Sequence, residues 1–473
     1  MIDMKKGRNS SFGVFATMGI VVAILIALQF LPPFTLFGHE MRPVELFSDI
    51  LGRDKVQSSS TLPASTRRGE ERVQGSKIKK QKDKPVEIIT DFSNDSCHGL
   101  RVFYDALHNL PDMDRPVRIA YFGDSYIESD LLTCDLRERF QDEFGGSGVG
   151  WVDCGTTTNS QRPTVRQTES GFNSYATIDK NHFNGRRQGI SERYFTVSDF
   201  ARLSLNSTPY KKHTSTWEES SLFLMTHDTI TVTATSAYGT ETFVVTANKH
   251  IQQLTTGKEG SRFKVQGSNG EDDKGPSKVL TLRSVKWEIS DTIGATYYGA
   301  TCDSKTGVTI DNFAMRGNSG LKLASIPQTT LNELGQLRPY DLIILQYGLN
   351  AYSPKLKKEW FDMYARAIGR AISKLKEAYP DAAIIVASIP PRGERQDGET
   401  VMMSGIQRMV DCQKRIAKEN NVVFMNLYEL MGGEKGLQTY IEKGYIGHDY
   451  THITFEGGRH LARRMYDAIM KKK

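Results

Sequence analysis

The chain has 473 residues, of which 38% are hydrophobic and 25% are charged, and its formal net charge is +6. It is long enough for more than one folded core. The excess positive charge falls within residues 53–84, which hold ten Lys/Arg and four Asp/Glu, whereas residues 85–473 carry no net charge. The folded part therefore lacks the basic surface that nucleic-acid binding requires, and we expect no nucleic-acid partner.

An apolar segment lies near the N-terminus. Lys5, Lys6 and Arg8 precede residues 12–31, an apolar run long enough to span a hydrocarbon core about 30 Å thick as a helix. The apolar part of a removed signal peptide, the alternative, is usually shorter, about 7–15 residues. We expect a single-pass anchor in the inner (cytoplasmic) membrane. Residues 1–11 would face the cytoplasm, and the rest of the chain the periplasmic or extracellular side.

Two features of composition concern the linker and the cysteines. Residues 32–86 contain few large apolar residues after about position 53, which predicts a flexible linker. The five cysteines show no C-x-x-C pair and no metal-like spacing. Cys134 and Cys412 lie in helix-like segments and are interpreted as core thiols, while Cys97, Cys154 and Cys302 leave a disulfide open, including one from Cys154 to Cys302.

The first α/β segment, residues 87–154, contains the motif that matters most. A helix is predicted over 97–110, a buried strand over 117–123, and a second helix over 131–144. The strand ends in Gly123-Asp124-Ser125, so a serine hydroxyl is expected at the rim of an open sheet. The glycine-rich run 145–150 lacks the pattern of a nucleotide-binding loop and is interpreted as a helix C-cap and tight turn.

Residues 155–302 have a different pattern. Short alternating segments at 222–225, 229–235, 241–247, 262–266, 279–289 and 295–300 are separated by turn residues. They predict an all-β sandwich inserted into the α/β domain. Aromatic residues such as Trp217 and Trp287 could form a sugar-stacking face, although aromatic residues of sandwiches more often belong to the core. If these aromatic residues do stack on sugars, the insert is a carbohydrate-binding module.

The α/β pattern returns in residues 303–473. Strands are predicted at 307–313, 340–347, 382–389 and 422–427, and helices at 355–379, 402–420 and from 456 to the end. This alternation predicts an α/β fold of three α/β/α layers around a mostly parallel sheet.

Residues from four separate segments could form one catalytic site. Ser125 is the candidate nucleophile, His452 its base, and Asp449 the carboxylate that orients His452. The carboxyl ends of parallel strands meet in one crevice, which would bring these segments together. Taken singly, Asp124 and Ser125 fit a turn with a helix cap, and residues 449–452 a loop with a cap.

Three groups are candidates for stabilising the oxyanion of an ester-cleavage intermediate. They are the backbone N–H of Ser125, the backbone N–H of Gly317, where the missing side chain would permit close approach, and the side-chain amide of Asn350. Such donors each typically contribute about 3–4 kcal/mol to lowering the barrier.

The four segments resemble the blocks of the SGNH or GDSL-type hydrolases: residues 123–125, Gly317, residues 348–350 and residues 449–452. The longer sequence segments 121–130 and 144–150 resemble the bacterial peptidoglycan O-acetylesterase branch. The resemblance covers about 87–154 and 303–473. It implies an SGNH-like fold with a β-sandwich insert, and a serine esterase acting on O-acetylated polysaccharide outside the cytoplasm. It also implies no metal and no cofactor.

Three alternatives stay open. The second block, residues 315–318, departs from the Gly-x-Asn-Gly-Ala form of the family, so Gly320 is a second candidate for the role of Gly317. The same apparatus could transfer the acyl group to a sugar, making the chain an O-acyltransferase. The chain could also be a non-catalytic glycan-binding protein of the cell envelope.

Overall fold

The computed structural model describes residues 87–94, 99–156, 158–179, 182–257, 262–265, 281–396 and 399–471, and the short strands β1 (Phe34–Leu36) and β2 (His39–Met41). Residues Met1–Lys82 and Asp83–Lys473 are separate units. The expected transmembrane helix at 12–31 lies outside the described residues, as does most of the expected linker, in which β1 pairs antiparallel with β2. None of the described helices combines the length and apolar character needed to cross a bilayer.

A six-stranded sheet forms the centre of the second unit. Its order is β15-β4-β16-β17-β20-β3, and all neighbours are parallel except the antiparallel edge strand β3. Every residue of β4 is buried, because layers cover both faces of the sheet. The strands are β3 (Ile89–Asp91), β4 (Val117–Gly123), β15 (Val308–Ala314), β16 (Leu342–Gln346), β17 (Ala383–Ala387) and β20 (Val423–Met425).

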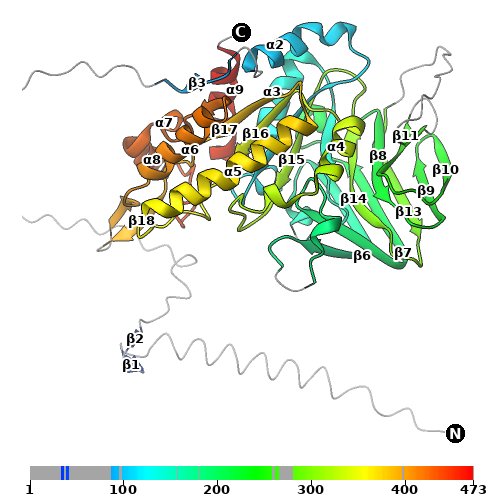
Figure 1. Ribbon diagram of the computed structural model, residues 1–473, viewed down its shortest axis with the longest axis horizontal. Helices are drawn as coiled ribbons and strands as arrows, with labels where there is room; N and C mark the ends of the chain where they lie inside the picture. Colours follow the sequence, from blue (N-terminus) through cyan, green and yellow to red (C-terminus); the bar gives the residue numbers. More distant parts are fainter. Residues whose placement is uncertain are drawn as a thin grey trace, which may run out of the picture. The chain divides into compact units, whose positions relative to one another are not determined.

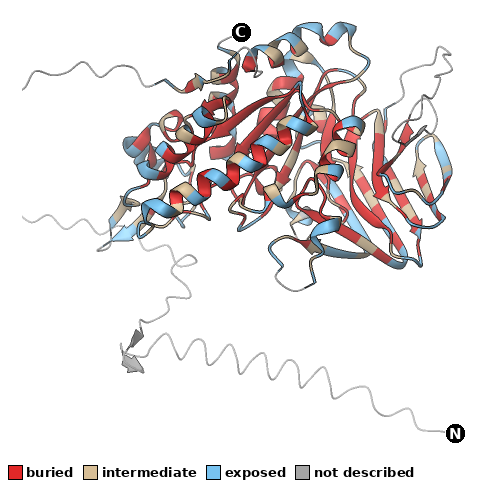
Figure 2. Cartoon of the chain, viewed as in Figure 1, coloured by how far each residue is buried: buried red, intermediate tan, exposed pale blue. Residues whose placement is uncertain are grey.

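Helices enclose this sheet in the three-layer arrangement expected from the sequence (Figure 1). One group packs as α4 and α6 against α5, and another as α3 against α9. Figure 2 shows buried residues along the central strands and exposed residues on the outer sides of the helices. The helices are α2 (Leu100–Asn109), α3 (Thr133–Phe144), α4 (Gln328–Leu337), α5 (Lys358–Ala378), α6 (Gln407–Glu419), α7 (Leu427–Leu430), α8 (Gly433–Glu442) and α9 (Phe455–Met470).

Residues 148–303 form a β-rich segment with a core of its own, in which Trp217 and Trp287 are fully buried. These two tryptophans are core residues and do not form a sugar-stacking face. The ten strands pair antiparallel in one continuous sheet, so two separate sheets of a sandwich are not established. They are β5 (Gly148–Val152), β6 (Val165–Ala176), β7 (Arg193–Ser207), β8 (Glu219–Met225), β9 (Ile230–Ser236), β10 (Gly239–Val245), β11 (Gln252–Gly257), β12 (Arg262–Val265), β13 (Ser284–Ser290) and β14 (Thr296–Asp303).

Strand β5 links the two sheets of the unit. Gly145 caps the C-terminus of α3 as expected, but the glycine run continues into β5, which pairs with β14. The glycines allow this close approach, because a Cβ on Gly148 would lie 2.2 Å from the carbonyl oxygen of Cys302. The ten-stranded sheet therefore starts before residue 155.

The disulfide that the sequence left open between Cys154 and Cys302 does not form. Both are free and fully buried. Cys134 and Cys412 are also free and buried, while Cys97 lies outside the described residues. Burial raises the pKa of the Cys154 and Cys302 thiols well above the usual range, so both stay protonated near neutral pH.

Candidate active site

Three strand ends place the candidate residues side by side. In the sheet, Gly123 at the end of β4 is paired with Ala314 of β15 on one side and with Gln346 of β16 on the other. The segments that follow these strands carry Ser125, Gly317 and Asn350. Parallel strands in register release their following loops at the same edge, so the register of this sheet brings the three segments together.

Ser125 has the partner that its chemistry requires. Its Oγ lies 2.8 Å from Nε2 of His452, and the serine is 7% exposed. The opposite ring nitrogen of His452, Nδ1, lies 2.5 Å from Oδ2 of Asp449. A carboxylate on Nδ1 favours the tautomer in which Nε2 is free to accept the serine proton. The structure thus brings together the three residues that the sequence proposed as a catalytic triad.

The loop that carries Asp449 and His452 is held by its own backbone. Oδ1 of Asp449 accepts hydrogen bonds from the backbone N–H groups of Thr451 and His452, both at 3.0 Å. Burial alone would raise the pKa of Asp449, but the hydrogen bonds from His452 and Thr451 outweigh it and lower that pKa. Asp449 is therefore ionised at neutral pH.

A short hairpin borders the same loop. It consists of β18 (Gly393–Gln396) and β19 (Glu399–Met402), and the backbone N–H of Gly393 donates to the carbonyl oxygen of Tyr450. Tyr450 has a positive φ of 55°, which few residues other than glycine adopt. The hairpin contact holds this turn in place between Asp449 and His452.

Asp124 is a buried carboxylate next to the nucleophile. Its Oδ1 accepts from the backbone N–H of Tyr126 at 3.0 Å, and its Oδ2 accepts from Nδ2 of Asn350 at 2.9 Å. Burial raises the pKa of Asp124 to about 6, although these hydrogen bonds and His452 oppose the rise. Asp124 therefore ties the serine turn to the loop after β16, a role that the sequence analysis did not assign.

Two backbone N–H groups are free to hold an oxyanion. Among the residues that the structure describes, neither the N–H of Ser125 nor that of Gly317 donates a hydrogen bond. Gly317 has φ +76°, and nothing lies within 4 Å of a Cβ built on it. The backbone conformation at this position therefore favours glycine.

Gly320, the second candidate, does not fit the same role. Its N–H already donates to Oδ1 of Asn318 at 2.9 Å. A Cβ on Gly320 would lie 2.7 Å from the ring of Tyr347, so this glycine allows the loop to pack on that ring. Gly317 is the better oxyanion candidate of the two.

Asn350 lies at the site, but its amide hydrogens are engaged in this structure. Nδ2 donates to Oδ2 of Asp124 at 2.9 Å and to the carbonyl oxygen of Asn318 at 3.1 Å. An amide nitrogen has two hydrogens, so one of these bonds must be shared or released before Asn350 can donate to an oxyanion.

A residue of the β-rich segment also contacts the loop after β15. Glu192, which precedes β7, is 2% exposed, and its Oε1 accepts from Nδ2 of Asn318 at 2.6 Å and from the hydroxyl of Tyr347 at 3.1 Å. Burial raises the pKa of Glu192. No sequence pattern indicates this contact, because Glu192 lies in an irregular turn with a positive φ of 59°.

A buried ionic cluster supports the segment after Ser125. Asp130 accepts hydrogen bonds from Arg137, Arg162 and the amide of Asn312. Burial alone would raise the pKa of Asp130, but Arg137 and Arg162 hold it well below its usual range. Arg162 lies between β5 and β6, so the cluster joins the two sheets beside the site.

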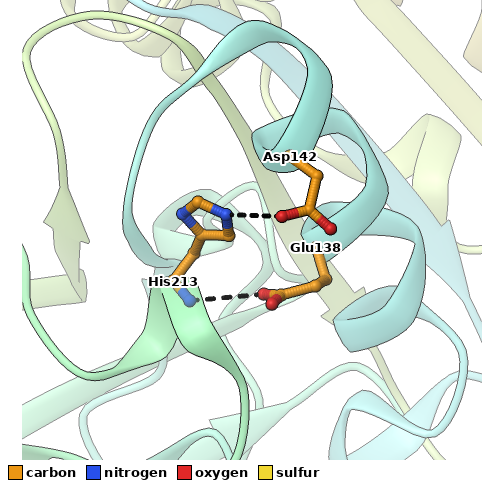
Figure 3. Close-up of side chains that lie close together, drawn as sticks. All are labelled: Glu138, Asp142 and His213. Atoms are coloured by element: carbon orange, nitrogen blue, oxygen red, sulfur yellow. Dashed lines mark hydrogen bonds and ion pairs between the residues drawn. The ribbon is translucent and has the colours of Figure 1, made fainter.

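One cluster has side chains of types that can bind a metal ion: Glu138, Asp142 and His213 (Figure 3). Glu138 of α3 already accepts from the backbone N–H groups of Lys212 and His213, at 3.0 and 3.3 Å. Asp142 lies 3.0 Å from the His213 imidazole and 3.4 Å from Nζ of Lys212. With these partners the two carboxylates attach the turn η5 (Lys212–Thr214) to α3.

Comparison with known proteins agrees with this geometry. Residues 287–459 match the GDSL-like lipase/acylhydrolase family, a range that includes Gly317, Asn350, Asp449 and His452. No curated protein sequence matches the chain.

The fold of the chain resembles solved structures. A structure titled "Peptidoglycan O-acetylesterase in action" is 18% identical, with a TM-score of 0.62, and the alignment covers 81% of this chain and 99% of that one. A Bacillus subtilis protein is 13% identical, with a TM-score of 0.30, covering 64% and 88%. An acetylxylan esterase from Geobacillus stearothermophilus is 21% identical, with a TM-score of 0.27, covering 35% and 73%. The first shows that the α/β fold and the β-rich segment occur together in another chain.

Proposed function

We propose that the chain is a serine esterase that removes O-acetyl groups from an extracytoplasmic polysaccharide, with peptidoglycan as the polymer. The observation that carries the proposal is the pair of contacts that joins Ser125 Oγ to His452 and His452 to Asp449. The free N–H groups of Ser125 and Gly317 lie beside it. The acylhydrolase family match and the fold likeness to a peptidoglycan O-acetylesterase support it.

In the proposed mechanism, Oγ of Ser125 attacks the acetyl carbonyl carbon while Nε2 of His452 takes the hydroxyl proton. The negative oxygen of the tetrahedral intermediate accepts from the N–H groups of Ser125 and Gly317, and from Asn350 once that amide is released. The sugar oxygen leaves with the proton from His452, which yields acetyl-Ser125. Water, deprotonated by His452, then attacks the acetyl group and releases acetate.

The location of the enzyme forms part of the proposal. We propose that residues 12–31 anchor the chain in the inner membrane and leave the acylhydrolase unit on the periplasmic or extracellular side. The apolar run and its basic flank support this arrangement. A reporter enzyme active only outside the cytoplasm, fused after residue 473, should be active. A reporter active only inside the cytoplasm should be inactive, and the reverse result would refute the topology.

The decisive experiment measures acetate released from O-acetylated peptidoglycan and, in parallel, from acetylated xylan. The wild-type chain should release acetate from peptidoglycan, and Ser125→Ala should release none above background. Ser290→Ala, at an exposed end of β13, serves as the control and should keep full activity. Undiminished release by Ser125→Ala would overturn the catalytic assignment, and release from xylan alone would overturn the polymer.

A further inference from the structure

A groove outside the candidate active site lies between the last two helices of the chain, α8 and α9, and is bordered by the turn that follows α8. Its cavity volume is about 380 Å³. The side chains that matter here are basic or aromatic: Lys435, Tyr440, Lys443, Tyr445, His460 and Arg464. None of them belongs to the proposed catalytic machinery, and we call this feature the α8–α9 groove.

The positive charge of the α8–α9 groove is not neutralised. No described residue lining it carries a carboxylate, and Lys435, Lys443 and Arg464 form no ion pair within the described ranges. By contrast, Arg463, the neighbour of Arg464, does not line the groove and lies 4.0 Å from Asp467. Cations that line one groove without counter-charges repel one another, so a bound anion would stabilise them.

A buried donor also lines the groove. Tyr440 is 2% exposed, and its hydroxyl lies beside Arg464 but donates no hydrogen bond of good geometry to any described residue. A buried hydroxyl without a partner costs free energy, which a ligand oxygen in the groove would recover. Burial raises the pKa of Tyr440 to about 12, while Arg464 opposes the rise, so the hydroxyl keeps its proton near neutral pH.

The imidazole of His460 is fixed in place by two rings. It stacks on Tyr445 with centroids 5.0 Å apart and meets Tyr440 edge-on at 5.5 Å. Burial, and then the charges of Arg464, Lys443 and Arg463, lower the pKa of His460. A ring held this way can donate to or accept from a ligand without first losing rotamer freedom.

We propose that the α8–α9 groove binds a phosphate group. Phosphate has several acceptor oxygens and up to two negative charges, which suits two lysines, an arginine fork and a tyrosine hydroxyl better than a single-charged carboxylate does. The phosphate could belong to an anionic lipid headgroup or to a soluble phosphorylated molecule. Both sources present phosphoryl oxygens to the groove, with one negative charge on a phosphodiester headgroup and up to two on a phosphomonoester.

The first experiment titrates inorganic phosphate into the full-length chain at low salt by calorimetry, with acetate as the comparison anion. Phosphate should bind more tightly than acetate. Arg464→Gln and Lys435→Gln should each weaken phosphate binding about tenfold, the equivalent of one charge-assisted hydrogen bond. Lys414→Gln removes the same charge from an exposed position on α6. Because salt screens a distant surface charge, this variant should change the phosphate affinity less than about twofold.

The second experiment identifies the source of the phosphate. The full-length wild type and Arg464→Gln are compared for sedimentation with vesicles of phosphatidylglycerol and of phosphatidylcholine, so that the N-terminal segment is the same in both proteins. If Arg464→Gln binds phosphatidylglycerol vesicles more weakly than wild type does, and phosphatidylcholine vesicles equally well, the ligand is a lipid headgroup. Equal vesicle binding with lost phosphate binding identifies a soluble phosphorylated ligand. Equal phosphate affinity of wild type, Arg464→Gln and Lys435→Gln overturns the proposal.

Discussion

The carboxylate of Glu192 accepts a hydrogen bond of 2.6 Å from the side-chain amide of Asn318, the residue that follows Gly317. Glu192 comes from the β-rich segment and Asn318 from the loop after β15. The oxyanion candidate Gly317 is therefore positioned partly by a residue far away in the sequence. This contact makes the β-rich segment part of the candidate site and not a separate appendage.

Replacing Glu192 should affect catalysis more than binding. Glu192→Ala removes the acceptor for both Asn318 and Tyr347, so kcat for acetyl ester cleavage should fall about tenfold or more, because donors misplaced by a fraction of an ångström lose much of their effect. KM should change little. Glu192→Gln keeps one acceptor oxygen and should restore part of kcat.

Steady-state kinetics with a soluble acetyl ester tests this expectation. Glu169→Ala, an exposed change on β6, is the matched control and should behave as wild type. A Glu192→Ala enzyme that folds and retains full kcat would show that the contact has no positioning role.

Replacing Gly317 by alanine should have two separable effects, one on stability and one on kcat. An alanine at φ +76° costs about 1–2 kcal/mol of unfolding free energy through backbone strain alone. Gly294→Ala, at φ +75° and with equally open space around its Cβ, should lose the same stability. Only Gly317→Ala should also lower kcat, about 100-fold, because its N–H would move away from the oxyanion.

Urea unfolding and kcat, measured on both alanine variants, separate strain from chemistry. If both variants lose stability equally and both keep wild-type kcat, Gly317 does not supply an oxyanion donor.

Asp449→Asn should preserve the loop and impair the histidine. The amide oxygen can still accept from the backbone N–H groups of Thr451 and His452, but an NH₂ group would face Nδ1 of His452 and favour the wrong tautomer. By analogy with other serine hydrolases, kcat should fall about 10³–10⁴-fold with little change in KM. Asp381→Asn, at an exposed site, is the control. A loss smaller than about tenfold would argue against an orienting role for Asp449.

The pH dependence of stability should report on Asp124. Burial raises its pKa from 3.8 to about 6, so the neutral carboxyl is the form that the fold favours. Its stabilising contribution is fully present below pH 3.8 and is lost as the pH rises through 6. The total is about 3 kcal/mol, from 1.36 kcal/mol per pKa unit.

Asp124→Asn removes that titration. The difference in unfolding free energy between wild type and Asp124→Asn should therefore shift by up to about 3 kcal/mol against the wild type between pH 4 and pH 7. Asp114→Asn, an exposed control, should show no such shift. A constant difference across this range would show that Asp124 does not titrate as described.

The sequence predicts the α/β part of the fold well. Strand β4 is a continuous apolar run and helix α5 has a clear amphipathic stripe, so period and composition agree with the tertiary structure. Ser125, Gly317, Asn350, Asp449 and His452 were each indicated because they follow strand ends or precede the last helix. Parallel topology then required their loops to meet at one edge.

Other features depend on contacts that sequence patterns do not encode. The long strands β6 and β7 were not predicted, and most of β6 is exposed and polar, which gives no alternating core face. β5 was hidden by its glycines, which are needed for close backbone approach to β14. The supporting residues Glu192 and Arg162 act across the boundary between the two sheets, so only the tertiary structure identifies them.

The pairing of β5 with β14 bears on how this enzyme could be shortened. Val152 lies opposite Ala300, so the β-rich excursion leaves and rejoins the α/β layer at adjacent points, where a tight hairpin could replace it. Such a minimal chain would keep Ser125, His452 and Asp449. It would lose Arg162, one of the two arginines that neutralise buried Asp130, and Glu192, the acceptor for Asn318. Truncation at this junction is thus simple for the backbone but damaging for the catalytic edge of the sheet.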